Sequence, residues 1–347
     1  MNQETKLLWM AATLLTSIPL CAAGAPPQDT THRHMTLKPA MLVSGLEGSL
    51  GSTIGPDGAL YVPEGTAGRI ARIHVETGAV TTFASGLPKS AVGVGGGAMD
   101  IAFLGETAYV LITLVNPLVG GNDIDGIYRV DGPNSFTVVA DVGRWSAAHP
   151  PKPGFKIEVA TGSTYAMETY HGQLLVTDSH LNRVLRIKVA GCISSPPADD
   201  SNISELIAFG DVVPTGLAIA GHTIYMAEAG PLPNQPEDGK IVEFESRHPL
   251  AMKVASGAPQ LVDVEFGPHH HLYGLSHGLW GGGVPGEPGL PNTGSLVRVN
   301  DDGGFTLIAD HLDRPTSLEF IGNTAYYVSL AGEVWKIEGI SWNHGYH

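Results

Sequence analysis

The sequence predicts an all-β fold: a six-bladed β-propeller closed by an N-terminal strand that completes the last blade. Its first support is a Leu-Tyr-Val-like run that occurs six times, with spacings of 48, 66, 50, 48 and 53 residues between successive copies. A period near fifty residues is typical of propeller blades. Its second support is a set of three further strand-like runs around most copies. The six copies are centred on Tyr61, Tyr109, Leu175, Tyr225, Tyr273 and Tyr326.

The runs around each centre alternate apolar and polar residues and are rich in β-branched and aromatic side chains, which favours strands over helices. Turn sequences such as "GPDG" at 55–58 separate them. The predicted first strands are 51–54, 100–103, 165–168, 215–219, 262–266 and 316–320. The predicted third strands are 69–73, 126–130, 183–187, 240–244, 295–299 and 333–337.

A fourth run follows the third in every copy but the last. The sixth copy ends after "EVWKIEGI" without one, whereas "AMLVSGL" at 40–46 precedes the first copy and is similar to the fourth runs "TFASGL" and "KVASGA". We therefore expect residues 40–46 to complete the sixth blade. Such closure leaves no blade without a neighbour and no interior sheet edge exposed.

The N-terminus has the features of a secretory signal peptide over residues 1–25. Lys6 supplies positive charge, "LLWMAATLLTSIPL" supplies the apolar region and "CAAGA" supplies small residues for cleavage. We expect a loose segment at 26–38, the propeller at 39–340 and a short tail at 341–347. The predicted location is secreted or periplasmic. A lipid anchor on Cys21 is the less favoured alternative, because the bulky Leu20 precedes it.

The composition limits the partners. The net charge is −15 and basic residues form no stripe, which argues against nucleic acid as a partner. No segment after the leader is long and apolar enough to span a bilayer. We expect a monomer that binds a small molecule or a cell-envelope partner.

Loop length selects one face of the predicted ring. Connections from second to third strands are long in the second, fourth and fifth copies, at 113–124, 229–237 and 277–292. In antiparallel blades these connections lie on the same face as the crossings between blades, and the long crossing 143–163 joins them there. Long loops on one rim of a rigid ring indicate a binding surface, although neutral insertion at exposed loops gives the same pattern.

Several acids map to equivalent positions of the repeat. Glu64, Asp178 and Glu228 each stand three residues after the centre of their copy. Asp100 and Asp263 lie on the first strands of the second and fifth copies, which are opposite in a ring of six. Converging carboxylates can bind Ca²⁺ or another divalent cation, or supply a general base. They can equally accept backbone N–H groups and join neighbouring blades, the role favoured for Asp178.

The candidate ligand-binding set is therefore Asp100, Asp263, Glu64, Glu228, His277 and Trp280, and the four acids are also the candidate cation ligands. His277 and Trp280 belong to the long fifth-copy loop. A rim histidine can act as base or metal ligand, but it is more commonly only solvated. The sequence contains no G-x-S-x-G, H-E-x-x-H, P-loop or dinucleotide motif, so the catalytic residues stay unassigned.

Segments of the blades resemble the ScyD/ScyE family, whose name comes from proteins associated with scytonemin biosynthesis. The similar segments include "IGPDGALYVPEG", "DVGRWSAAHPPKPG", "LLVTDSHLNRVLRI" and "VPTGLAIAGHTIYMAEAGPLP", and the resemblance runs from about residue 40 to 338. The blade pattern is also similar to NHL repeats and to gluconolactonase-like propellers. The resemblance implies a secreted propeller and no defined reaction. Where the family has His before the Asp of the second blade, this chain has Met99.

We accordingly expect a secreted accessory or binding propeller whose long-loop face holds a small molecule or partner, together with a cation. A metal-dependent hydrolase or lactonase that uses carboxylates at the channel mouth is the first alternative. A protein-interaction scaffold is the second.

Overall fold

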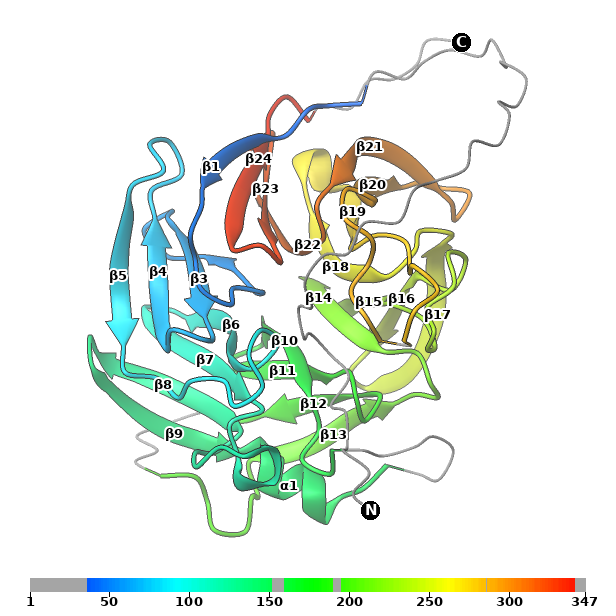
Figure 1. Cartoon of the computed structure of the whole chain (residues 1–347). Helices are drawn as coiled ribbons and strands as arrows, with labels where there is room; N and C mark the ends of the chain where they lie inside the picture. The colour runs from blue at the N-terminus through cyan, green and yellow to red at the C-terminus, as the bar shows by residue number, and fades with distance from the viewer. Residues whose placement is uncertain (1–35, 152–158, 190–194, 285, 341–347) are drawn as a thin grey trace, which may run out of the picture.

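A computed structural model describes residues 36–151, 159–189, 195–284 and 286–340. Its strands form six four-stranded antiparallel sheets arranged radially around a central axis (Figure 1). The six-bladed propeller is thus confirmed. The expected signal peptide, most of the expected loose segment and the tail lie outside the described residues.

Each blade contains four consecutive strands, numbered from the channel outward, except that the outer strand of the sixth comes from the N-terminal side. The strands of the first three blades are β2 (Thr53–Ile54), β3 (Leu60–Glu64), β4 (Arg69–Ile73) and β5 (Val80–Ser85); β6 (Gly97–Leu104), β7 (Thr107–Thr113), β8 (Gly126–Gly132) and β9 (Ser135–Asp141); and β10 (Thr164–Tyr170), β11 (Gln173–Asp178), β12 (Arg183–Ile187) and β13 (Ile203–Ala208).

The strands of the last three blades are β14 (Pro214–Ala220), β15 (Thr223–Glu228), β16 (Lys240–Glu245) and β17 (His248–Ser256); β18 (Leu261–Phe266), β19 (Leu272–Ser276), β20 (Gly294–Val299) and β21 (Phe305–Leu312); and β22 (Pro315–Ile321), β23 (Thr324–Ser329), β24 (Glu333–Ile337) and β1 (Ala40–Val43).

The ring closes as the sequence predicts. Strand β1 pairs antiparallel with β24, Met41 lying opposite Trp335 and Val43 opposite Val334. Figure 1 shows the blue β1 beside the red β24. Val43 is 7% exposed and packs in a cluster that also contains side chains of the first blade, so the closing strand joins both ends of the ring.

The antiparallel order gives the ring two distinct faces. The long-loop face carries the connections between second and third strands and the crossings between blades; its long loops are residues 114–125, 229–239 and 277–293. The turn face carries the short connections between first and second strands, such as 171–172 and 221–222. Every inner strand therefore begins at the long-loop face and ends at the turn face.

The core lies between the blades. The second strands are the most buried, as in β3, where all five residues are buried, while the outer β5 begins with three exposed residues. The aromatic centres of the repeat join neighbouring sheets: the ring of Tyr61 lies edge-on to Phe83 at 5.0 Å and to Phe103 of the next blade at 4.9 Å.

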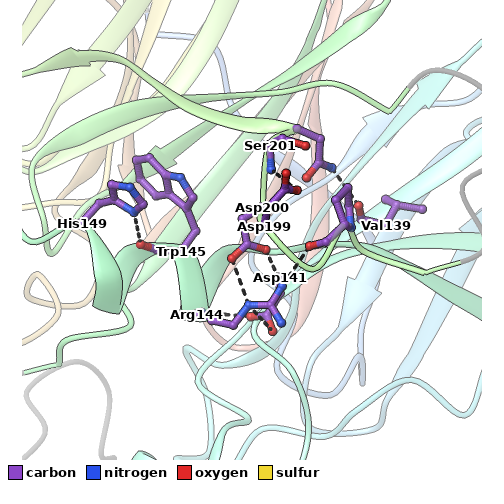
Figure 2. A network of polar contacts seen from close by, with 10 residues as sticks. Val139, Asp141, Arg144, Trp145, His149, Asp199, Asp200 and Ser201 are labelled. Carbon is purple, nitrogen blue, oxygen red and sulfur yellow. Dashed lines mark hydrogen bonds and ion pairs between the residues drawn. The ribbon is translucent and has the colours of Figure 1, made fainter.

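One short helix, α1 (Val142–Ala148), lies in the crossing that the sequence analysis treated as a loop. Asp141 caps it by accepting from the backbone N–H of Arg144 at 2.9 Å. The Arg144 guanidinium in turn donates to both carboxylate oxygens of Asp200, at 2.9 and 2.5 Å (Figure 2). This network fastens the crossing to the third blade. None of the helices in the described part of the chain is long and apolar enough to cross a membrane.

Candidate functional site

The inner strands enclose a small cavity on the propeller axis, the channel chamber. Its volume is about 30 Å³, enough for a metal ion or very few water molecules and too little for a sugar or a lactone. Five carboxylic side chains line it, and the described lining residues include no Lys, Arg or His. The five are Asp100, Glu168, Asp263, Glu265 and Glu319.

Asp100 and Asp263 enter the chamber from opposite blades, and both also join neighbouring blades. Asp100 accepts from the N–H of Met167 in the third blade at 2.7 Å and from that of Ile101 at 2.9 Å. Asp263 accepts from the N–H of Leu318 in the sixth blade at 2.7 Å and from that of Val264 at 2.9 Å. The structure therefore brings these two predicted residues to one site and gives each a structural contact as well.

A glycine on the preceding blade makes room for each aspartate. A Cβ on Gly51 would lie 2.4 Å from Oδ1 of Asp100, and a Cβ on Gly216 would lie 2.0 Å from Oδ1 of Asp263. Real Cβ atoms do not approach an oxygen so closely. The Gly–Asp pair thus occurs twice, half a ring apart.

The three glutamates form a second layer that the sequence analysis missed. Each pairs in its sheet with the centre of its own copy: Glu168 with Leu175, Glu265 with Tyr273 and Glu319 with Tyr326. They therefore occupy one repeat-equivalent position in three blades. Aligning the first strands on the Leu-Tyr-Val-like centres was the available signal, because it places the final Glu of "YAME" beside those of "VDVEF" and "TSLEF".

Tyr165 crosses the chamber on the side of the long-loop face. It extends from the third blade, and its hydroxyl donates to the carbonyl of Thr316 in the opposite, sixth blade at 2.9 Å. The inner strands are also buried at this end, which indicates that the chamber is closed toward the long-loop face. Strand β22 is buried from Pro315 to Leu318 and half-buried from Glu319 onward. The same change occurs along β6, where only the last two residues are half-buried. The chamber therefore opens toward the turn face.

Burial, and after it repulsion between carboxylates, raises the pKa of the acids in the chamber. Burial raises the pKa of Asp263 to about 7, although the N–H groups of Leu318 and Val264 oppose the rise. Burial likewise holds the pKa of Asp100 well above its usual range. For Glu265 and Glu319, burial and then repulsion from neighbouring carboxylates raise the pKa well above the ordinary value. Raised pKa values of this kind favour bound protons or a bound cation in the chamber.

The donor set fits a hard cation, since carboxylate oxygens are the ligands that Ca²⁺ prefers. In the described part of the chain, however, no three His, Cys, Asp or Glu side chains are already grouped closely enough to hold a metal ion. A cation in the chamber would therefore draw the carboxylates inward from the positions seen here.

Glu64 and Glu228, the other two candidate cation ligands, do not line the chamber. Each is 1% exposed and pairs with a basic residue on the neighbouring strand. Both Glu64 oxygens accept from the Arg69 guanidinium, at 2.6 and 2.9 Å, while Glu228 lies 3.0 Å from the ammonium of Lys240. These contacts hold the ends of the β3–β4 and β15–β16 hairpins together.

His277 and Trp280 lie on the long-loop face, away from the chamber lining. His277 is 7% exposed, and its Nδ1 donates to the carbonyl of Pro315 at 2.8 Å. Burial lowers the pKa of His277 to about 4, so the ring is neutral near pH 7. Trp280 is half-buried, and its Nε1 donates to the carbonyl of Val284 at 3.4 Å.

Asp178, three residues after the third centre, is fully buried and has the contacts of a structural group. Its Oδ1 accepts from the N–H groups of Ser163 and Leu181, at 3.1 and 3.0 Å. Its Oδ2 lies 3.7 Å from Nε of the equally buried Arg183, whose guanidinium lies over the Trp145 ring at 4.9 Å.

A larger groove of about 580 Å³ lies at the boundary of the first two blades, on the long-loop face. The crossing residues Leu87 and Lys89 form one wall, and Asp123 of the long β7–β8 loop lies on the other. Tyr128 and Phe136 also line the groove. Its volume is in the usual range for a small-molecule site, and its walls offer apolar, aromatic and charged groups.

Comparison with known proteins identifies shared architecture. No protein-family model matches the chain, and no curated protein is significantly similar in sequence. Solved structures do match over most of their length. A gluconolactonase from Xanthomonas campestris is 12% identical, covers 89% of this chain and 93% of its own, and has a TM-score of 0.57. The calcium-binding protein regucalcin from Agrobacterium tumefaciens is 12% identical, with coverages of 87% and 93% and a TM-score of 0.56.

Virginiamycin B lyase from Staphylococcus aureus is 14% identical, with coverages of 88% and 99% and a TM-score of 0.52. At such identities the likeness concerns the fold alone. The chain therefore shares the six-bladed propeller of known lactonases, lyases and calcium-binding proteins, and its membership of the ScyD/ScyE family stays a proposal.

Proposed function

We propose that the protein is a binding propeller whose channel chamber takes up a divalent cation, with Ca²⁺ as the first candidate. The observation that carries this proposal is the chamber itself: five carboxylic side chains line one cavity whose described lining contains no basic residue. Protons neutralise these carboxylates at low pH and leave them as pH rises, whereas a divalent cation stabilises several ionised carboxylates at once. The calcium-binding neighbour with the same fold supports this choice of ion.

The test is calcium titration of metal-free protein by calorimetry at about pH 8, together with elemental analysis of protein purified without chelator. We expect one bound Ca²⁺ per chain. Asp263→Asn and Glu319→Gln should each weaken binding by a factor of about ten or more, because each removes one anionic ligand. Glu106→Gln is the matched control, since Glu106 is an exposed acid on the same turn face. Equal binding by all variants would refute the proposal.

We further propose that the small-molecule function lies at the groove between the first two blades on the long-loop face. The volume of about 580 Å³ supports it. A compound library screened by thermal shift should return ligands whose effect is lost in Phe136→Ala and Lys89→Ala. Hits that stabilise both variants as much as the unchanged protein would place small-molecule binding elsewhere.

A metal-dependent hydrolase or lactonase is the second candidate function. The specific observation in its favour is the pKa of Asp263 at about 7, which suits a general base near neutral pH. The chamber is too small for a substrate, so the reacting group would have to enter at its mouth on the turn face. A lactone and ester panel with added Ca²⁺ tests this: turnover lost in Asp263→Asn supports an enzyme. Absence of turnover with intact Ca²⁺ binding supports a binding protein.

Export and monomeric state are also part of the proposal. The apolar leader over 1–25 supports export, and cell fractionation with N-terminal sequencing of the mature protein tests it. Light scattering after gel filtration tests the monomer. The third function is a protein-interaction scaffold. It is supported if the chamber binds no cation, the groove binds no compound and the protein captures a cell-envelope protein.

A further inference from the structure

The side chains of two histidines are in contact on the turn face, which is opposite the long-loop face. His171 occupies the turn between β10 and β11, and His222 occupies the turn between β14 and β15, so the pair joins the third and fourth blades. Both residues are exposed. Nε2 of His171 lies 3.1 Å from Nδ1 of His222, and the ring centroids are 4.8 Å apart with 31° between the ring planes.

The arrangement is held by Tyr170, which contacts both turns. Its ring packs edge-on against the imidazole of His171 at 4.4 Å, and its hydroxyl donates to the carbonyl of His222 at 3.3 Å. Tyr170 itself is only 7% exposed, so it is fixed by the fold. A buried neighbour therefore positions the imidazole of His171 and the backbone of the turn that carries His222, which reduces the ordering cost of binding a shared ligand.

The distance between the nitrogens matches that of two imidazoles on one metal ion. Zn–N bonds of about 2.0–2.1 Å in tetrahedral geometry place two ligand nitrogens roughly 3.3 Å apart. The centroid separation of 4.8 Å, with 31° between the planes, shows that the rings lie side by side at a tilt and not end to end. In the metal-free protein the same contact is an N–H···N hydrogen bond. On metal binding the donor ring would carry its proton on its other ring nitrogen, so that both imidazoles stay neutral and each offers a lone pair to the ion.

We propose that His171 and His222 form a surface site for a divalent transition metal of the class that prefers imidazole, namely Cu²⁺, Ni²⁺ or Zn²⁺. Water completes the coordination shell on the exposed side. The bound ion links the third and fourth blades at the turn face. This site is chemically distinct from the channel chamber, whose oxygen ligands favour Ca²⁺, and it does not depend on the proposed function.

The test compares untagged protein with His171→Asn and His222→Asn. Asparagine suits position 171 because its φ is 47°, a left-handed conformation that Asn tolerates. His74→Asn is the matched control, because His74 is another exposed histidine at a turn of the same face. Calorimetry and electron paramagnetic resonance with Cu²⁺ are recorded in the presence of saturating Ca²⁺.

We expect each pair variant to lose one bound equivalent of Cu²⁺, or to bind it more weakly by a factor of about ten or more, while the control retains it. The resonance spectrum of that equivalent should show two nitrogen ligands. Uptake that is the same in the unchanged protein and in both pair variants would show that the histidines form only a hydrogen bond. A site lost equally in the His74 control would overturn the assignment as well.

Discussion

The titration of Asp263 gives the sharpest prediction. Its pKa rises from 3.8 in the unfolded chain to about 7 in the fold. The difference of about 3 units corresponds to roughly 4 kcal/mol, since one unit is about 1.36 kcal/mol. Because the folded pKa is the higher one, the folded protein binds the proton more tightly. The stabilisation is therefore complete below pH 3.8, declines as pH rises and is lost above about pH 7.

The perturbation is Asp263→Asn, which removes the titration and keeps the size of the side chain. Urea unfolding of metal-free protein is measured at about pH 5 and pH 8. The free energy of unfolding declines over about 2 of these pH units, from pH 5 to about pH 7, so Asp263 should lower it by about 3 kcal/mol. Asp263 is only half-buried by exposed area, so solvent screening reduces this loss to about 2–3 kcal/mol. The variant should show a correspondingly smaller loss. Its poorer hydrogen bond to Leu318 costs stability equally at both pH values and cancels in the comparison.

The other chamber carboxylates titrate in the same direction and persist in the variant, so some pH dependence remains. Saturating Ca²⁺ should restore stability at pH 8, by about 2.7 kcal/mol at one hundred times the dissociation constant. Parallel pH dependence in the unchanged protein and the variant would show that Asp263 does not titrate with a raised pKa. So would an unchanged protein that becomes more stable from pH 5 to pH 8 without metal.

Three further outcomes follow from the packing. Gly216→Ala places a Cβ 2.0 Å from Oδ1 of Asp263 and should destabilise the fold by about 1–3 kcal/mol in urea unfolding. The control Gly210→Ala, whose Cβ would have no atom within 4 Å, should change stability by less than about 0.5 kcal/mol. Equal effects of the two variants would contradict the tight contact at Gly216. Tyr165→Phe removes the hydroxyl that crosses the chamber and should cost about 0.5–1.5 kcal/mol by the same measurement, and no loss would mean that the hydrogen bond is replaced by water. Val43→Ala in the closing strand should lower the free energy of unfolding by about 1–3 kcal/mol. An unchanged free energy of unfolding would mean that β1 does not stabilise the closed ring.

The fold could be predicted from the sequence because each blade repeats the same local pattern. The Leu-Tyr-Val-like centres mark a buried second strand in every blade, and "AMLVSGL" shares the pattern of the fourth strands it replaces. The short helix α1 was missed, since seven residues inside a long polar crossing give too little periodicity.

The site was only partly predictable. Asp100 and Asp263 could be found, because their copies are opposite in a ring of six. Glu64 and Glu228 share a repeat position as well, but that position ends a hairpin and faces a basic residue on the next strand. Which side a strand residue faces depends on the bulges in the inner strands of the second to sixth blades, such as that between Leu261 and Asp263, and the sequence pattern does not show the bulges.

The repeat places His171 and His222 in neighbouring turns, but the sequence does not show that their rings are in contact. His171 and His222 are 51 positions apart, in the equivalent turns of consecutive blades, and the closed ring places those turns beside each other. Their contact is a property of blade packing and not of a motif.

Crystals of the protein grown with Ca²⁺, measured for anomalous scattering, test the central claim most directly. We expect one anomalous peak on the propeller axis, within bonding distance of carboxylate oxygens that include those of Asp263. A chamber that contains only water at saturating Ca²⁺, with its carboxylates unmoved, would contradict it.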